Sequence, residues 1–202
     1  VEKRDGRWND VETVFASIGQ VTVQATPISL LRAISVVGVE GKMFVPHFMK
    51  EAKEISAMGE PGASGYWEAR PSAVFNQSEP KIVKMTPAQN KVILDGMWGA
   101  VNAGGTAGGI KMTNWEIAGK TGTAQVARLG QDVGANKDHA WFVSFAPAYK
   151  PEIAIIGLIE NSGFGGRNAA PAAKGVYETY VGKHYPHLLG NPEQINYGGL
   201  AN

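Results

Sequence analysis

Two apolar runs joined by a short turn constrain the fold of this chain most strongly. Residues 140–146 read AWFVSFA, residues 152–160 read EIAIIGLIE, and the turn between them is PAYKP. A turn of about five residues joins only antiparallel strands, because a parallel crossover needs roughly a dozen residues or more. The second run is apolar at consecutive positions, which is typical of a strand buried on both faces. With a further strand around Lys120, the sequence predicts three consecutive strands in an antiparallel meander.

Three segments carry the start signals and the apolar spacing of helices. Thr26-Pro27 and Thr86-Pro87 each combine an N-cap residue with a proline at the first helical position. Apolar residues then recur at helical spacing, namely Ile28, Leu31, Ile34 and Val37 in one segment and Val92, Ile93, Met97 and Val101 in the other. A third helix is expected over residues 169–181, ending at Gly182. The predicted fold class is α/β of the α+β type, with helices flanking an antiparallel sheet.

The segments between these elements carry weaker signals. Residues 42–52 are expected to form one strand. Residues 54–77 are rich in Gly, Pro, Ser and Ala and are expected to form a loop with at most a short hairpin. The glycine-rich stretches 102–109 and 161–168 are expected to be turns or loops, because no phosphate-binding GxxxxGK[ST] pattern is present.

Composition and charge exclude several kinds of partner. The chain has 202 residues, 19 Lys+Arg against 18 Asp+Glu and a formal charge of +1, so nucleic acid is not expected as a partner. It has no cysteine, which excludes disulfides and thiolate metal sites. It contains no run of roughly 18 apolar residues, so any membrane anchor is expected to lie outside this chain.

The end of the chain is interpreted as a tail, residues 183–202, that follows a domain spanning residues 1–182. His184 and His187 lie in this tail and could in principle share a metal ion. Because no carboxylate or cysteine stands near them, a solvated tail is favoured over a metal site. We expect neither a metal nor an organic cofactor.

The segment with the most distinctive chemistry is WEIAGKTGTAQV, residues 115–126. Lys120 supplies a positive charge with three donors, and Thr121 and Thr123 stand two residues apart, so their hydroxyls share one face of a strand. Gly122 has no Cβ and lets another backbone approach. Such a strand edge suits an extended ligand whose carboxylate is held by the cation and the hydroxyls. A plain strand with Lys120 in solvent is the alternative.

The same segment resembles a known family. Residues 119–126 read GKTGTAQV and residues 138–147 read DHAWFVSFAP, while Ser17-Ile18-Gly19-Gln20 precedes Thr26-Pro27. This order and spacing resembles the C-terminal part of the transpeptidase domain of class B penicillin-binding proteins, most of all the penicillin-binding protein 2 family of cell elongation, over most of residues 8–182. The resemblance implies part of a penicillin-binding transpeptidase fold of the β-lactamase type. Val21 departs from the family, which usually has glycine there.

The resemblance also implies a role for each residue of the motif. Lys120 would stabilise the substrate carboxylate, and the hydroxyls of Thr121 and Thr123 would bind it. The backbone N–H of Thr123 would be one donor of the oxyanion hole, and Gly122 would give clearance.

The family's nucleophile belongs to an S-x-x-K motif, and an S-x-N motif follows it. No S-x-N occurs here. The one S-x-x-K, at Ser78–Lys81, contains Pro80, which argues against the helical turn that this motif needs. We therefore expect the nucleophile to be absent from this chain, and the chain alone to be inactive.

If the resemblance holds, the parent protein is a serine D,D-transpeptidase that cross-links peptidoglycan. It would act on stem peptides ending in D-Ala-D-Ala, bind β-lactams and contact the cell-elongation machinery at the periplasmic face of the bacterial inner membrane. The exposed surface of the partial domain could support a homodimer. Three alternatives stay open: a serine β-lactamase or carboxypeptidase relative, a non-catalytic β-lactam sensor, and a scaffold module of wall synthesis.

Overall fold

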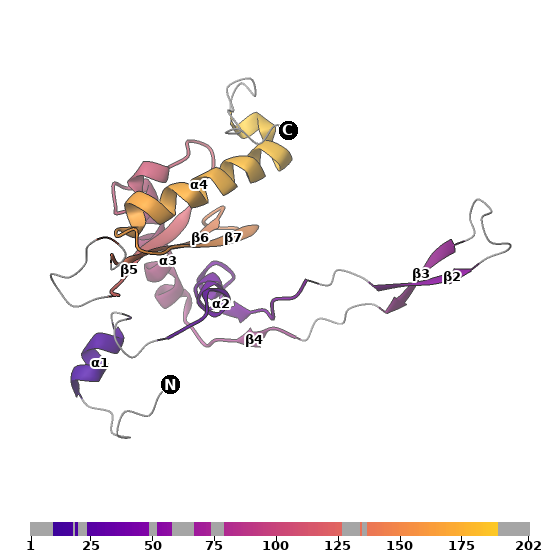
Figure 1. Cartoon of the computed structure of the whole chain (residues 1–202), viewed down its shortest axis with the longest axis horizontal. Helices are drawn as coiled ribbons and strands as arrows, with labels where there is room; N and C mark the ends of the chain where they lie inside the picture. The colour runs from indigo at the N-terminus through magenta and orange to yellow at the C-terminus, as the bar shows by residue number, and fades with distance from the viewer. Residues whose placement is uncertain are drawn as a thin grey trace.

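The structure is a computed structural model in which a three-stranded sheet lies between two sets of helices (Figure 1). It describes residues 10–17, 19, 24–48, 52–57, 67–73, 79–126, 134 and 137–189. Val21, Phe75 and Ser78 therefore lie outside the described residues.

The sheet consists of β5 (Ala118–Ala124), β6 (His139–Ala146) and β7 (Ile153–Ile159) in the order β5-β6-β7. Both pairs are antiparallel, with Lys120 opposite Val143 and Val143 opposite Ile156. The predicted meander is therefore confirmed. The expectation that residues 152–160 form a strand buried on both faces is wrong, because β7 lies at the edge of this sheet and its residues are only half-buried. Because β6 occupies the centre, β5 has one edge without a strand partner among the described residues, and this edge carries the Lys120 segment.

The residues of β6 alternate between two faces of the sheet, as the two-residue period of a strand requires. Phe142 and Ala146 belong to the larger core cluster, which is completed by helix α4 (Gly165–His184). Phe145 belongs to a second cluster with residues of helices α2 (Pro27–Gly38) and α3 (Pro87–Asn102). Figure 1 accordingly shows α4 on one side of the sheet and α2 and α3 on the other.

Helices α2 and α3 begin where the sequence predicts. The Thr26 hydroxyl accepts a hydrogen bond from the Ser29 N–H at 3.3 Å. Thr86 forms a capping box with Gln89, because each side chain bonds the other residue's backbone N–H, at 3.2 and 2.9 Å. The helices are less buried than predicted, since Ile28 is 51% and Val92 73% exposed. Only the C-terminal part of each predicted apolar stripe reaches the core.

Helix α4 is longer than predicted at both ends. It begins at Gly165 within the stretch expected to be a loop, and it continues to His184 rather than ending at Gly182. The short helix η3 (Pro186–Leu188) follows, and Leu188 and Leu189 pack against the larger core cluster. Residues 183–189 thus join the fold, while the division of the chain at residue 182 stays a prediction.

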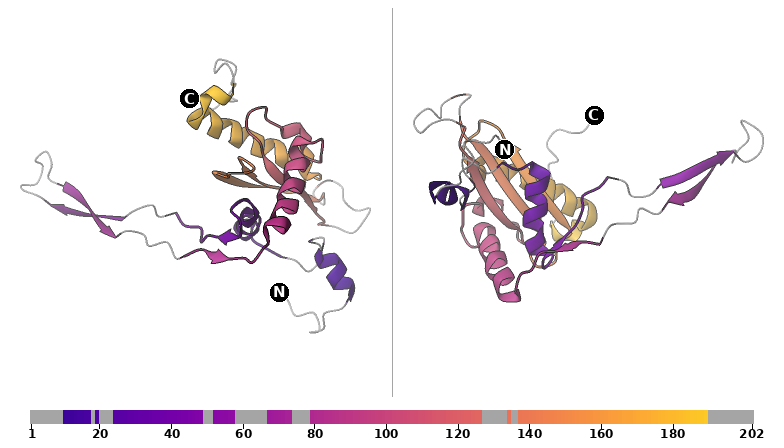
Figure 2. Two further views of the ribbon diagram at one scale, coloured as in Figure 1. Left: turned by 180° about the vertical axis from the view of Figure 1, so that it is seen from behind. Right: turned by 90° about the horizontal axis from the view of Figure 1, so that it is seen from below.

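Three further corrections concern the first half of the chain. A helix that was not predicted, α1, spans Asp10–Ser17. The single strand predicted over residues 42–52 is wrong, because β1 covers only Lys42–Met43 and pairs with β4 (Lys81–Ile82). The short hairpin allowed within residues 54–77 is present and larger than expected: β2 (Ala52–Ala57) pairs antiparallel with β3 (Trp67–Ala73). Figure 2 shows this hairpin standing away from the sheet and its helices.

Candidate active site

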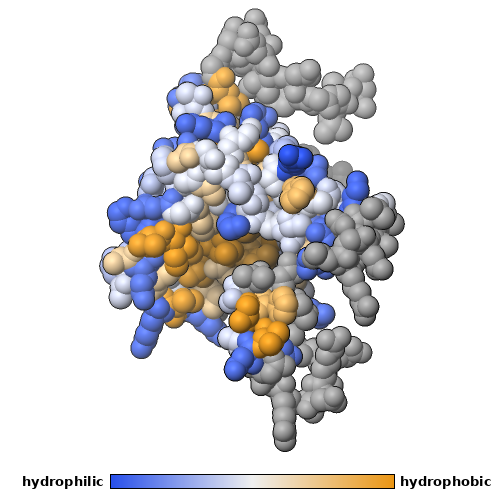
Figure 3. Space-filling model, turned by 90° about the vertical axis from the view of Figure 1, so that its left-hand side faces the viewer, coloured by the Kyte–Doolittle hydropathy of each residue, from blue (hydrophilic) through white to orange (hydrophobic). Residues whose placement is uncertain are grey.

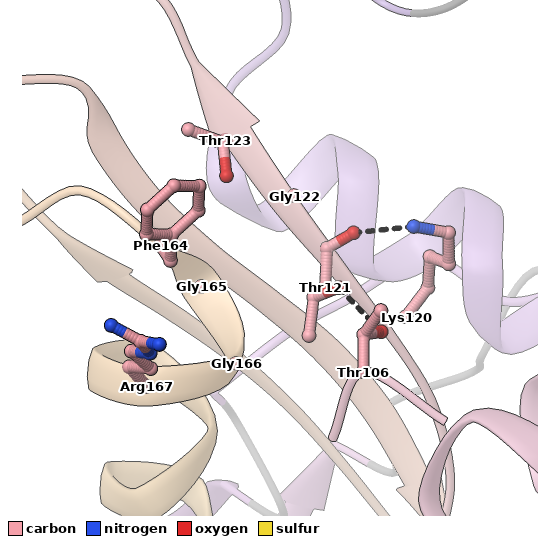
Figure 4. A pocket seen from close by; sticks show the side chains of 9 residues that line it. All are labelled: Thr106, Lys120, Thr121, Gly122, Thr123, Phe164, Gly165, Gly166 and Arg167. Atoms are coloured by element: carbon pink, nitrogen blue, oxygen red, sulfur yellow. Dashed lines mark hydrogen bonds between the residues drawn. The ribbon is translucent and has the colours of Figure 1, made fainter. Parts of the chain in front are cut away.

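The free edge of β5 forms one wall of a pocket of about 610 Å³. Lys120, Thr121, Gly122 and Thr123, the four candidate residues, all line it. The Lys120 side chain is exposed, and its ammonium donates a hydrogen bond to the carbonyl oxygen of Thr121 at 2.7 Å. The cation lies along the rim of a pocket (Figure 4), and its binding role stays a prediction.

A second wall comes from the glycine-rich turn that follows α3. Thr106 lies in this turn, and its hydroxyl is 2.9 Å from the hydroxyl of Thr121. The turn is anchored beneath the pocket by Asn102, whose side-chain amide donates to the carbonyl oxygens of Trp98 at 2.9 Å and Ile117 at 2.8 Å. Asn102 therefore ties the end of α3 to the residue that precedes β5.

The third wall is the start of α4, where residues 164–167 read FGGR. Gly165 and Gly166 let this helix start touch the other two walls. A Cβ on Gly165 would collide with the carbonyl oxygens of Trp141 and Gly122, and one on Gly166 would collide with that of Thr106. The sequence predicts that Gly122 lets another backbone come close. In the structure this backbone is that of the α4 start, and Gly122 also lines the pocket.

Arg167 and Phe164 complete this wall. The guanidinium of Arg167 lies over the Phe164 ring, with its central carbon 5.9 Å from the ring centroid. Figure 4 shows both side chains on the side of the pocket across from Lys120. Among the described residues, the lining therefore contains two cations and three threonine hydroxyls and no acidic residue. This composition suits an anionic ligand.

Sequence reasoning missed five of the residues that line the pocket: Thr106, Phe164, Gly165, Gly166 and Arg167. They belong to the two glycine-rich stretches that were interpreted as plain turns and loops. The only sequence signal was the run of glycines at each place, which by itself does not say that the two stretches meet.

The other candidate positions are separate from the pocket. Lys81 opens β4, and its S-x-x-K partner Ser78 lies outside the described residues. His184 is the last residue of α4, with its ring 4.5 Å from that of Tyr180, and His187 lies in η3. Within the described part of the chain, no three His, Asp or Glu residues are grouped closely enough to hold a metal ion. In the same part, no helix has the length and apolar character needed to cross a membrane.

A comparison with models of protein families shows which family this chain matches. Residues 2–178 match the family model of the penicillin-binding protein transpeptidase domain. The chain belongs to the penicillin-binding transpeptidase family. The β5 strand with its Lys-Thr-Gly motif is thus part of a penicillin-binding transpeptidase fold, as the sequence resemblance implies.

Individual relatives agree with this assignment. The chain is 35% identical over 189 residues to the peptidoglycan D,D-transpeptidase MrdA of Acinetobacter baumannii, a match covering 88% of this chain and 25% of the relative. MrdA of Haemophilus influenzae is 31% identical over 90% of this chain and 27% of the relative. The chain therefore spans about a quarter of the length of these relatives.

Solved structures give the same result for the fold. Pseudomonas aeruginosa PBP2, solved in complex with WCK 5153, has a TM-score of 0.65 at 30% identity, covering 93% of this chain and 36% of that one. PBP2 of Helicobacter pylori, solved in complex with MreC, has a TM-score of 0.59 at 27% identity, covering 86% and 29%. The recognition of the penicillin-binding protein 2 family from the sequence is confirmed.

Proposed function

We propose that this chain is the substrate-clamping C-terminal part of a peptidoglycan D,D-transpeptidase. The single observation that carries the proposal is the placement of Lys120, Thr121, Gly122 and Thr123 together on the pocket edge of β5. In this role the Lys120 ammonium and the hydroxyls of Thr121 and Thr123 bind the terminal carboxylate of the stem peptide. The backbone N–H of Thr123 stabilises the oxyanion that forms when the peptide carbonyl is attacked.

The reaction is an acyl transfer in two steps. A serine hydroxyl attacks the carbonyl of the penultimate D-Ala, loses its proton to a base, and the terminal D-Ala leaves with a proton on its amine. The amine of a neighbouring stem peptide then attacks the resulting ester and releases the serine. We place the serine and its base on residues outside this chain, because an S-x-N motif is absent from it and its one S-x-x-K contains Pro80. This chain supplies positioning and electrostatic stabilisation.

Covalent labelling with a β-lactam tests whether the nucleophilic serine lies outside this chain. Intact-mass spectrometry after incubation with a β-lactam is expected to give an unchanged mass for the 202-residue chain. The longer protein that includes upstream S-x-x-K and S-x-N motifs is expected to gain one ligand mass. An acylated 202-residue chain would contradict the proposal, and peptide mapping would then show whether Ser78 carries the ligand.

Substitution of Lys120 in the longer protein separates the enzyme from the alternatives. Lys120→Ala is expected to reduce the acylation rate by about 100-fold or more, the typical effect of removing a preorganised electrostatic contact. Lys174→Ala removes a lysine that pairs with Glu178 on α4 outside the pocket, and it serves as the control. A scaffold module would keep its function in wall synthesis with either substitution, and a sensor would be acylated without cross-linking stem peptides.

Location and partners follow from the same proposal. We place the parent protein at the periplasmic face of the inner membrane, with its anchor outside this chain, and residues 1–182 within the transpeptidase domain. The H. pylori PBP2 relative was solved in complex with MreC, which supports a partner from the cell-elongation machinery. Co-purification of the longer protein with its cognate MreC tests this assignment, and absence of binding would contradict it.

An apolar surface remains open on this chain. Figure 3 shows hydrophobic residues gathered in a hollow on one side of the molecule. Exposed aliphatic residues include Ile28 on α2 and Val92 and Ile93 on α3. We propose that upstream residues of the transpeptidase domain cover this surface, and that the isolated chain associates into homodimers through it.

Sedimentation velocity of the isolated chain tests the homodimer. Association is expected to increase with concentration and to weaken when Val92 and Ile93 are both replaced by Ser. Val176→Ser is the control, because Val176 is also an exposed aliphatic residue but lies on α4. A chain that stays monomeric at high concentration would contradict the homodimer.

A further inference from the structure

Arg167 occupies the first turn of α4, on the wall of the pocket across from Lys120. Its side chain is exposed, and its guanidinium lies over the ring of Phe164. A cation held over an aromatic ring keeps its hydrogen-bond donors available at the edge of the guanidinium plane. Arg167 therefore presents its donors at the pocket wall rather than having them engaged in the core.

The helix start that carries Arg167 is fixed in place by close packing. Gly165 and Gly166 approach the backbones of Trp141, Gly122 and Thr106 more closely than a residue with a Cβ could. Because these contacts are between backbones, the distance between the Arg167 position and β5 is set by the fold. A ligand lying along β5 thus meets the Lys120 cation at one side and the Arg167 cation at the other (Figure 4).

The charges of the pocket are not balanced within it. Its lining, as far as the structure describes the chain, contains two cations and no acidic side chain. In the described part of the chain, no carboxylate lies within ion-pair distance of Arg167 or Lys120. One terminal carboxylate on Lys120, Thr121 and Thr123 would satisfy only one of the two cations. The guanidinium also offers a planar pair of donors, which matches the two oxygens of a carboxylate better than an ammonium does.

We propose that Arg167 is a specificity-determining residue that binds a second carboxylate of the peptide, upstream of its terminal one. The pocket then prefers peptides with an acidic side chain close to the D-Ala-D-Ala end over neutral peptides of the same shape. This inference rests on the proposed function, since it takes the first carboxylate to be held by the Lys-Thr-Gly strand.

Two peptides that differ by one charge test the inference on the 202-residue chain. Acetyl-Glu-D-Ala-D-Ala and acetyl-Gln-D-Ala-D-Ala are titrated separately while the backbone amide signals of Gly122 and Thr123 are followed by NMR. The Glu peptide is expected to bind about threefold more tightly, in keeping with an exposed ion pair. The preference is expected to shrink at high salt, where exposed charges are screened.

Variants then test whether Arg167 causes the preference for the Glu peptide. Arg167→Gln is expected to make the two affinities equal by lowering the affinity for the Glu peptide. Arg167→Lys is expected to retain part of the preference, because it keeps the charge without the planar donor pair. Lys120→Ala is expected to weaken both peptides alike.

The outcomes separate this inference from the function on which it rests. Equal affinities in the unmodified chain, or a preference that survives Arg167→Gln, would overturn the role of Arg167 alone. If neither peptide shifts the β5 amides, or if Lys120→Ala changes nothing, the clamping function itself fails and the role of Arg167 fails with it.

Discussion

The two faces of the β5-β6-β7 sheet are covered to different extents. The face under α4, here called the closed face, carries the larger cluster, in which Phe142 and Tyr177 are fully buried. The face under α2 and α3, here called the open face, carries a smaller cluster around Phe145 and Met97. Beside it, apolar side chains such as Val92 remain exposed. One face is thus completed by this chain, and the other has apolar surface left for something else to cover.

The difference explains how part of a domain can still hold a pocket in shape. The pocket is built from the edge of β5, from the start of α4 on the closed face, and from the turn that Asn102 ties to β5. The open face adds little to the pocket walls. A chain that spans about a quarter of the length of its relatives can therefore retain the pocket wall that carries Lys120.

The largest expected effect is the loss of a fully buried side chain from the closed face. Phe142→Ala is expected to lower the free energy of unfolding by about 3–5 kcal/mol, because it leaves a cavity between β6 and α4. Val92→Ala on the open face is expected to change it by less than about 0.5 kcal/mol in the isolated chain, since this side chain is 73% exposed. Chemical denaturation followed by circular dichroism measures both. Equal losses of stability in the two variants would mean that the two faces of the sheet are covered to the same extent.

The next largest loss of stability is expected at the start of α4. Gly165→Ala is expected to cost about 2–3 kcal/mol, because the new methyl group collides with backbone atoms that cannot rotate away. Gly175→Ala, in the middle of α4 with no neighbouring atom in reach, is expected to stabilise the chain by up to about 1 kcal/mol through helix propensity. Thermal unfolding compares the two variants, and a tolerated Gly165→Ala would contradict the close packing.

A smaller effect concerns the buried hydrogen bond of the closed face. The Tyr177 hydroxyl lies 2.9 Å from the Ser144 hydroxyl, and Tyr177→Phe is expected to cost about 1 kcal/mol. Burial raises the pKa of Tyr177 above its ordinary value. The unfolded chain therefore releases this proton at lower pH than the folded chain does, and the free energy of unfolding falls as the pH rises above about 10.

The pH dependence of the free energy of unfolding tests the role of the Tyr177 hydroxyl separately. Denaturation curves at pH 8 and above 10 are expected to show the variant losing less stability than the unmodified chain, so that the difference between them narrows. A constant difference across this range would show that Tyr177 ionises equally easily in both states.

The smallest effect is expected on the open face, at the helix starts. Replacing both Thr86 and Gln89 by Ala removes both bonds of a capping box and is expected to cost about 0.5–1 kcal/mol. Thr26→Ala is the matched control, because Thr26 caps α2 through its hydroxyl, whereas Gln89 at α3 also bonds the Thr86 N–H. Thermal unfolding is expected to show the smaller loss for Thr26→Ala. The reverse order would mean that α2 contributes more to the open face than α3 does.

Local signals explain why much of the fold was predictable. Thr26-Pro27 and Thr86-Pro87 determine helix starts through bonds within a few residues, and these starts are confirmed. The short turn between β6 and β7 permits only antiparallel pairing, which is confirmed as well. The Lys-Thr-Gly strand could be placed on a sheet edge because its motif and the family resemblance agreed.

Contacts between distant segments explain what could not be predicted. The exposure of Ile28 and Val92 cannot be read from helical spacing, because spacing shows which side of a helix is apolar and not what covers it. The early start of α4 depends on Gly165 and Gly166 lying against β5 and the Thr106 turn. From sequence alone, a run of glycines predicts a loop, because the backbone against which the glycines pack is not known.

By itself, the sequence determined the meander, the starts of α2 and α3, the family and the four residues on the β5 edge, because each depends on neighbours along the chain or on an intact motif. Only the tertiary structure decided that Thr106 and Arg167 share a pocket with them. These residues lie on segments before and after β5 in the sequence. Close packing of glycine backbones and the hydrogen bond between the Thr106 and Thr121 hydroxyls bring these segments together.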